Sequence, residues 1–262
     1  MPFLELSGYR LHHQALGEPT APPLLLIMGL GMASEAWDTL PTRLAARFRV
    51  LLLDNRGVGR STAPPGLFRI RDLADDAARV LDAEQVHQAF VFGISMGGMI
   101  AQELALRHPG RLRALALGAT FGGHWRSHKP ALGVARDLML VSLFAREPRR
   151  MARLLVSESF FASHPDRFRA WLGRLSRPDR ATARRQLLAI AGHEAEGRLA
   201  QLAVPTLVLS GDADRLVPVE NSRRLARTIP GARLLELPGV GHAFPFECAD
   251  RTVEALGAHF LA

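Results

Sequence analysis

The segment Gly93-Ile94-Ser95-Met96-Gly97 places a serine between two glycines, each two residues away, at the end of an apolar run. This spacing is typical of a sharp turn from a strand into a helix, with the serine at the apex in a strained backbone conformation. The glycines are needed because a Cβ atom at either position would collide with the neighbouring chain. A serine held in this way can act as a nucleophile. The alternative is one more small residue in a tight turn.

A nucleophilic serine needs a base, and the base needs an acid to orient it. Asp212 and Asp214 follow the apolar run Thr206–Ser210, and His242 follows the next run in a glycine-rich turn. The carboxyl ends of parallel strands share one edge of a sheet, where ligands usually bind. We expect Asp214 to be the acid, with Asp212 as the alternative or as a turn residue. The pattern therefore predicts a triad of Ser95, Asp214 and His242.

Attack of a serine on a carbonyl group creates a negatively charged oxygen, which preorganised N–H donors stabilise. The residue after the nucleophile, Met96, is expected to supply one backbone N–H. The second is expected from the loop Gly29-Leu30-Gly31, which follows the apolar run Leu24–Met28, with Leu30 as the donor. The loop can also be interpreted as a plain glycine turn, and both interpretations can hold together.

Short apolar runs without polar alternation recur along the chain and indicate strands that are buried on both faces. Segments with helical spacing lie between them, and an N-terminal hairpin is expected to turn at Ser7-Gly8. The alternation predicts an α/β fold with a mostly parallel sheet of about eight strands flanked by helices. The runs are 23–30, 49–56, 89–95, 113–120, 205–212 and 232–239, and the helical segments are 34–47, 70–84, 219–229 and 248–261.

Residues 121–199 break this alternation, because they hold helical patterns and no clear strand. We expect a core formed by residues 1–120 and 200–262, with residues 121–199 inserted as an all-helical cap. A connection of that length is usually functional. Most of its apolar side chains are expected to pack on the body, and a few to face a pocket. These side chains are Leu138, Met139, Leu143, Phe144, Leu154, Leu155, Phe160 and Phe161.

The insertion carries 15 Lys and Arg residues and 7 Asp and Glu residues. The difference equals the +8 net charge of the whole chain. The excess can be a solvated surface, can steer an anionic substrate such as a carboxylate-bearing lactone, or can dock an acidic carrier protein. A basic stripe interleaved with aromatic residues is absent, so nucleic acid is not an expected partner. Four histidines of the insertion, at positions 124, 128, 164 and 193, are expected at the surface or in the pocket.

The single cysteine, Cys248, excludes an intramolecular disulfide and is expected to be a packed residue rather than a reactive thiol. The chain starts without the basic and apolar regions of a signal peptide, and its most apolar window, 89–106, contains Gln102 and Glu103. We therefore expect a soluble cytoplasmic protein with no membrane span. Neither a cofactor nor a metal ion is expected.

Five stretches, taken in order, resemble the α/β-hydrolase superfamily, and within it the serine esterase and enol-lactonase group with a helical cap. They cover nearly the whole chain and read "LLLIMGLGMASEAWD", "LLLDNRGVGRS", "VFGISMGG", "VPTLVLSGDADRLVP" and "IPGARLLELPGVGH". The resemblance implies the same triad, oxyanion donors and cap. It also implies a structural role for Asp54 and Arg56. The family usually has a histidine where this chain has Met28, which leaves backbone donors in place.

The resemblance further implies hydrolysis of carboxylic esters or lactones of small molecules through an acyl-enzyme intermediate. Relatives with an aspartate nucleophile are excluded by Ser95, and Ala243 after the histidine counts against hydrolases of carbon–carbon bonds. One alternative is a methyl-ester or thioester hydrolase that acts on carrier-bound acyl chains. Another is a ligand-binding protein with this fold that does not hydrolyse.

Overall fold

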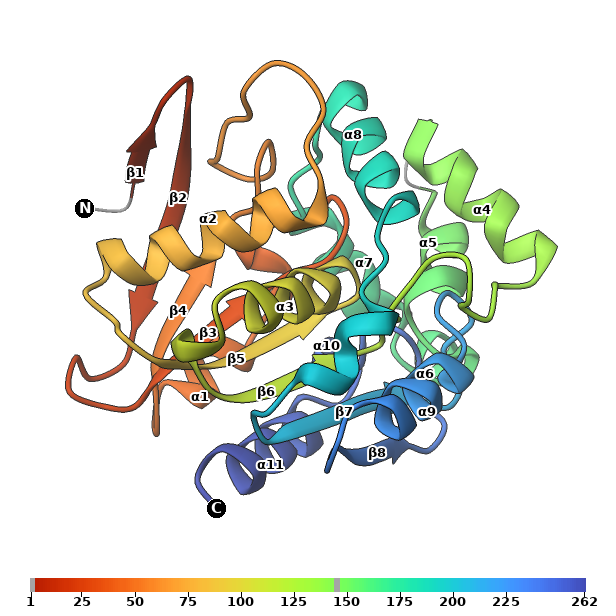
Figure 1. Cartoon of the computed structure of the whole chain (residues 1–262). Helices are drawn as coiled ribbons and strands as arrows, with labels where there is room; N and C mark the ends of the chain where they lie inside the picture. The colour runs from red at the N-terminus through yellow and green to blue at the C-terminus, as the bar shows by residue number, and fades with distance from the viewer. Residues whose placement is uncertain (1–2, 144–146) are drawn as a thin grey trace.

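The structure, a computed structural model, describes residues 3–143 and 147–262, and of residues 142 and 143 the backbone only. In this part of the chain one eight-stranded sheet has the order β1-β2-β4-β3-β5-β6-β7-β8 (Figure 1). The strands are β1 (Phe3–Leu6), β2 (Tyr9–Leu16), β3 (Pro23–Ile27), β4 (Arg49–Leu53), β5 (Ala89–Ile94), β6 (Leu112–Gly118), β7 (Thr206–Gly211) and β8 (Arg233–Leu237). Strand β2 pairs antiparallel with β1 and with β4, and all other neighbours are parallel. The predicted mostly parallel sheet and N-terminal hairpin are therefore confirmed.

Helices cover both faces of the sheet, and each face has its own apolar core (Figure 1). In β3, Leu24 and Leu26 point into one core, under α1 (Leu40–Leu44) and α11 (Ala249–Phe260). Leu25 and Ile27 point into the other, under α2 (Ile70–Ala83), α3 (Met96–Arg107) and α9 (Val219–Thr228). Burial on both faces is the reason that these strands are continuous apolar runs in the sequence.

The region expected to be one helix over residues 34–47 is two short pieces. A 3-10 turn, η1 (Ser34–Trp37), is followed by α1, and Asp38 between them has a φ of 52°. Pro41 lies in the first turn of α1, where its missing N–H costs nothing. The break bends the chain so that Trp37 and Leu40 can both be buried.

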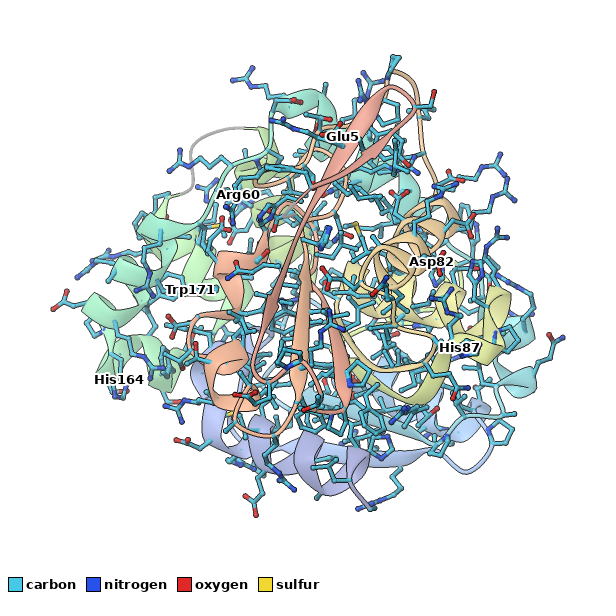
Figure 2. The ribbon with its side chains drawn as sticks, turned by 90° about the vertical axis from the view of Figure 1, so that its left-hand side faces the viewer. Glu5, Arg60, Asp82, His87, His164 and Trp171 are labelled. Atoms are coloured by element: carbon cyan, nitrogen blue, oxygen red, sulfur yellow. The ribbon has the colours of Figure 1, made fainter. Side chains whose placement is uncertain are left out.

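Between β6 and β7 the chain leaves the sheet and forms the helical segment (residues 121–199). Its helices are α4 (Leu132–Leu143), α5 (Pro148–Leu155), α6 (Glu158–Ser163), α7 (Pro165–Arg174) and α8 (Arg180–Ala191), followed by the 3-10 turn η3 (Glu196–Gln201). They gather beside the sheet, and in the turned view Trp171 and His164 lie on the opposite side of the strands from Asp82 and His87 (Figure 2). The helical segment therefore adds a separate layer to one side of the body.

Two short stretches, the neck (residues 122–124 and 193–195), connect the helical segment to the body. Gly123 forms an isolated antiparallel bridge with Glu194, and the Ala195 N–H donates to the Gly122 carbonyl at 2.7 Å. Buried side chains of the helical segment, such as Phe168 and Trp171, join the core under α1 and α11. Backbone hydrogen bonds at the neck and apolar packing therefore both help to hold the segment against the body.

The apolar side chains that were expected in the helical segment have different environments. Leu154, Leu155 and Phe160 are buried, whereas Met139 is 55% exposed. The Leu143 side chain and the whole of Phe144 lie outside the described residues. Among the helices of the described ranges, none combines the length and the apolar composition that crossing a membrane requires.

Candidate active site

Ser95 lies between the end of β5 and the start of α3, with φ 57° and ψ −123°, a conformation that a non-glycine residue rarely adopts. A Cβ atom on Gly93 would lie 2.2 Å from the Gly97 carbonyl oxygen, and one on Gly97 would lie 2.0 Å from the Ile27 oxygen. The predicted strand–turn–helix geometry and the need for both glycines are therefore confirmed. Further hydrogen bonds fasten the turn, from the Ser95 N–H to the Gly118 carbonyl and from Thr120 Oγ1 to the Ser95 carbonyl, both at 2.8 Å.

Asp214 and His242 meet beyond the ends of β7 and β8. The Nδ1–H of His242 donates to Asp214 Oδ2 at 2.8 Å, and both side chains are almost fully buried. The other carboxylate oxygen, Oδ1, accepts the N–H groups of Leu216 and Val217, each at 2.9 Å. These two donors hold the carboxylate in one orientation. With Nδ1 engaged, Nε2 of His242 is the ring nitrogen left to accept a proton.

The two candidate carboxylates have different environments. Asp212 is exposed, and its Oδ1 accepts the Gly239 N–H at 2.6 Å, which ties together the turns after β7 and β8. Asp214 is the one that contacts His242. A side chain that already closes a turn has the role expected of a turn aspartate.

The loop after β3 lies directly against Ser95. A Cβ atom on Gly29 would lie 3.0 Å from Ser95 Cβ and 3.6 Å from its Oγ. Leu30 follows in this loop, and among the described residues its N–H has no hydrogen-bond partner. Met96 is the first residue of α3, so its N–H has no partner within the helix. The two expected donors therefore lie on either side of the serine.

The loop after β3 is supported from two sides. The Asn55 side-chain amide donates to the Met28 carbonyl at 3.0 Å, and the Gly31 N–H donates to Gln186 Oε1 at 2.8 Å. Gln186 belongs to α8, so the helical segment contributes to the position of this loop. Met28, which precedes this loop, lines the cavity described below.

Asp54 and Arg56 are engaged within the body, in agreement with the structural role expected for them. Asp54 accepts the Ser34 N–H at 2.8 Å and contacts His12 at 3.0 Å. Arg56 forms an ion pair with buried Asp76. Neither side chain lines the cavity.

A cavity of about 390 Å³ lies between the helical segment and the rim of the sheet, that is, the turns that follow β3, β5, β7 and β8. Ser95 and His242 both line it, together with the loop after β3. Its remaining wall is mainly apolar and comes from both the body and the helical segment. These residues are Ala36, Ile94, Leu138, Val141, Met151, Leu154, Leu155, Trp171, Pro178, Ala183, Leu216, Ala243, Pro245 and Phe246. The volume and the apolar lining suit a small molecule that carries a hydrophobic group.

Glu247 links the histidine turn to the helical segment, a role that no sequence pattern indicates. Its Oε2 accepts the N–H groups of Gly241 at 3.0 Å and Ser157 at 3.1 Å, and its Oε1 accepts the Ser157 hydroxyl at 2.5 Å. The Ala243 N–H also donates to the Leu155 carbonyl at 2.6 Å. The turn that carries His242 is therefore fixed against the segment between α5 and α6.

The other histidines and the cysteine lie elsewhere. Among the described residues, none of the four histidines of the helical segment lines the cavity, and His193 is buried at 3% exposure. Cys248 donates its Sγ–H to the Phe244 carbonyl at 3.3 Å, and burial raises the pKa of its thiol. A thiol that stays protonated is a poor nucleophile, so Cys248 is better described as a packed residue than as a reactive one.

Comparisons with known proteins agree with this fold. The sequence model of the α/β-hydrolase fold family matches residues 22–248. The chain is 33% identical to the candidate carbamate hydrolase RutD of Azorhizobium caulinodans, over 93% of this chain and 92% of that protein. It is 31% identical to the rhodomycin D methylesterase DauP of Streptomyces sp. strain C5, over 96% and 95%.

A solved structure, the enol-lactonase from Burkholderia xenovorans LB400, matches with a TM-score of 0.87 and 26% identity over all of both chains. The family match covers most of this chain, and the relatives include hydrolases of esters and lactones. The chain is therefore a hydrolase of the α/β-hydrolase fold family, within its esterase- and lactonase-like group.

Proposed function

We propose that this protein hydrolyses carboxylic esters or lactones of small molecules, with Ser95 as nucleophile, His242 as base and Asp214 as the orienting acid. The observation that carries the proposal is the buried His242–Asp214 hydrogen bond at the wall of the cavity that Ser95 also lines. A strained serine, a histidine with one free nitrogen and a fixed carboxylate are the components of acyl transfer.

In the first step, Nε2 of His242 takes the proton of Ser95 as Oγ attacks the carbonyl carbon. The Asp214 carboxylate stabilises the imidazolium that forms, and its two backbone donors keep it from rotating. The tetrahedral intermediate collapses, the ester C–O bond breaks, and the imidazolium gives its proton to the leaving oxygen. In the second step His242 activates a water molecule, which hydrolyses the acyl-enzyme and regenerates Ser95.

The Leu30 and Met96 N–H groups are proposed to bind the carbonyl oxygen as it becomes negative. Both donors are already in place before the reaction. Met96 is the first residue of α3, and the loop of Leu30 is held by Asn55 and Gln186. Preorganised donors cost no rearrangement during the reaction. The positive end of α3 adds further stabilisation at this point.

The helical segment is proposed to act as a cap that selects the substrate. It supplies much of the apolar wall, including Leu138, Val141 and Trp171, and this wall suits an apolar acyl or alcohol group. The methylesterase and the enol-lactonase among the relatives support ester and lactone chemistry. The relative named for carbamates supports a second candidate, cleavage of a carbamate by the same residues.

The test is hydrolysis of p-nitrophenyl esters from C2 to C12, an enol-lactone and a phenyl carbamate by the wild type and by Ser95→Ala. We expect the loss of Ser95 to lower kcat about 10⁴-fold or more, because no other group can form the acyl-enzyme. Asp214→Asn is expected to lower kcat about 10³- to 10⁴-fold, whereas Asp212→Asn serves as the matched control.

Undiminished hydrolysis by Ser95→Ala would disprove the assignment. Preference for the carbamate would keep the triad and change the substrate class. Saturable binding without turnover of any of these compounds would favour a ligand-binding protein. Equal losses in the two aspartate variants would remove Asp214 from its proposed role.

A further inference from the structure

Two arginines of the helical segment, Arg177 and Arg180, line the cavity beside Ser95 and His242. These four are the polar side chains among the described lining residues, apart from the indole N–H of Trp171. That N–H donates to the Ala36 carbonyl at 3.1 Å. The proposed function uses Ser95 and His242, so the two guanidinium groups have no role in the reaction as written.

Both guanidinium groups are unpaired within the described residues, in contrast to several other arginines of the helical segment. Arg169 pairs with Asp166 at 2.8 Å and Arg174 with Asp38 at 2.6 Å. Arg177 and Arg180 contact no carboxylate or hydrogen-bond acceptor in the described ranges. Both are exposed, so they lie where solvent or a solute can reach them.

The carboxylates that contact residues beside this pair are engaged with backbone N–H groups. Glu35 Oε1 accepts the Ser176 N–H at 2.6 Å. No Asp or Glu lines the cavity in the part of the chain that the structure describes. Asp179, between the two arginines, is the N-cap of α8, and its Oδ1 accepts the Thr182 N–H at 2.6 Å. Arg180 is the first residue of α8, where the helix dipole disfavours a cation. An anion between the arginines would remove this unfavourable arrangement.

The pair is also close to the site of the proposed reaction. Pro178, between the arginines, packs on the loop after β3, because a Cβ atom on Gly31 would lie 3.3 Å from Pro178 Cγ. The same loop contacts Ser95 through Gly29. A small molecule whose carbonyl carbon lies at Ser95 Oγ can therefore extend a second group toward the arginines.

We propose that Arg177 and Arg180 bind a free carboxylate of the substrate, so that the preferred substrates are anionic esters or lactones. Monoesters of dicarboxylic acids and lactones with a carboxylate side chain belong to this class. This inference rests on the proposed ester hydrolysis for its catalytic readout. Planar guanidinium groups suit a carboxylate because they can donate two parallel hydrogen bonds to its oxygens.

The test compares monomethyl adipate, which is anionic, with methyl hexanoate, which has the same chain length and no charge. The readout is the ratio of kcat/KM for the two substrates, which cancels effects common to both. We expect the ratio to fall about tenfold in Arg177→Gln and in Arg180→Gln, and about 100-fold in the double variant. Arg184→Gln is the matched control, because Arg184 is an exposed arginine of α8 that does not line the cavity.

A second readout does not depend on turnover. Calorimetric titration of Ser95→Ala with adipate should give a dissociation constant that rises about tenfold when either arginine is also replaced. An unchanged ratio together with unchanged adipate binding overturns the inference and leaves ester hydrolysis intact.

Failure of the wild type to cleave any ester, with adipate binding still dependent on the arginines, instead refutes the proposed function alone. An equal fall in the ratio for Arg184→Gln would show that the total charge of the helical segment acts at long range, as in steering or carrier docking. That outcome also overturns the inference.

Discussion

The rim of the sheet and the helical segment contribute to one cavity in different ways. At the rim, positions are imposed by the backbone: Ser95 has a positive φ, and Gly97 approaches Ile27 so closely that no Cβ atom fits. The helical segment contributes no member of the proposed triad. Outside the backbone hydrogen bonds of the neck, it is positioned mainly by side-chain contacts, which include packing and ion pairs. Asp137, for example, lies 3.6 Å from both Arg150 and Arg153.

In the proposed function, this difference assigns chemistry and selectivity to separate parts of the molecule. A change at the rim is expected to lower kcat for every substrate. A change in the helical segment is expected to alter the relative rates of different substrates. The two parts join at the neck and at Glu247, so changes at these places test how far the parts are independent.

The largest effect expected on stability is at the neck and depends on pH. His193 is buried there, and burial lowers the pKa of its imidazole to about 4, below the usual 6.5. The unfolded chain therefore binds a proton between pH 6.5 and 4 that the folded chain excludes. This contribution to stability is complete above pH 6.5 and is lost as the pH falls toward 4. It amounts to about 2 kcal/mol between pH 7 and pH 4.5.

The measurement is the free energy of unfolding in urea at the two pH values for the wild type and His193→Gln. The variant cannot gain a proton at this position, so its loss of stability should be smaller by about 2 kcal/mol. Equal losses in both proteins would mean that His193 is protonated without unfolding the neck. At pH 4.5 the helical segment could unfold at a lower urea concentration than the sheet. That result would sharpen the comparison, since the two parts would then unfold separately.

The next effect is at Glu247, the residue that holds the histidine turn against the helical segment. Glu247→Gln removes the negative charge and leaves a single side-chain oxygen to accept the donors of Gly241 and Ser157. The new amide N–H₂ group is itself a donor, so it would face one of these donors without an acceptor. We expect kcat to fall about tenfold with little change in KM, because His242 would be less well oriented. Glu254→Gln is the control, since Glu254 is exposed on α11. A change in KM alone would mean that Glu247 serves the cap and not the histidine.

Much of the rim could be predicted from the sequence because its constraints are local. A glycine two residues from Ser95 on each side, or an aspartate directly after an apolar run, is visible in the printed chain. The same holds for the strands, whose burial on both faces leaves continuous apolar runs. The expected helix over residues 34–47 was wrong as one element, since the break at Asp38 depends on how Trp37 and Leu40 are buried.

The contributions of the helical segment could not be predicted because they depend on long-range packing. Arg177 and Arg180 look like the other arginines of a basic segment. That neither has a partner among the described residues is visible only in three dimensions. Glu247 contacts Ser157, 90 positions earlier in the chain. His193 was expected at the surface or in the pocket and is instead buried in the neck, where nothing in its local sequence marks it.

The smallest expected effect lies wholly within the helical segment and uses two residues of α4, two positions apart. Val141 lines the cavity, whereas Met139 is 55% exposed and does not. Val141→Phe should fill part of the cavity and leave less room for a long acyl chain. We expect the ratio of kcat/KM for a C8 ester to that for a C2 ester to fall about fivefold, which corresponds to about 1 kcal/mol. Met139→Phe adds a similar ring outside the cavity and should leave the ratio unaltered. A lower kcat for both esters in Val141→Phe would show that α4 influences the chemistry at the rim, and the separation between the two parts would fail.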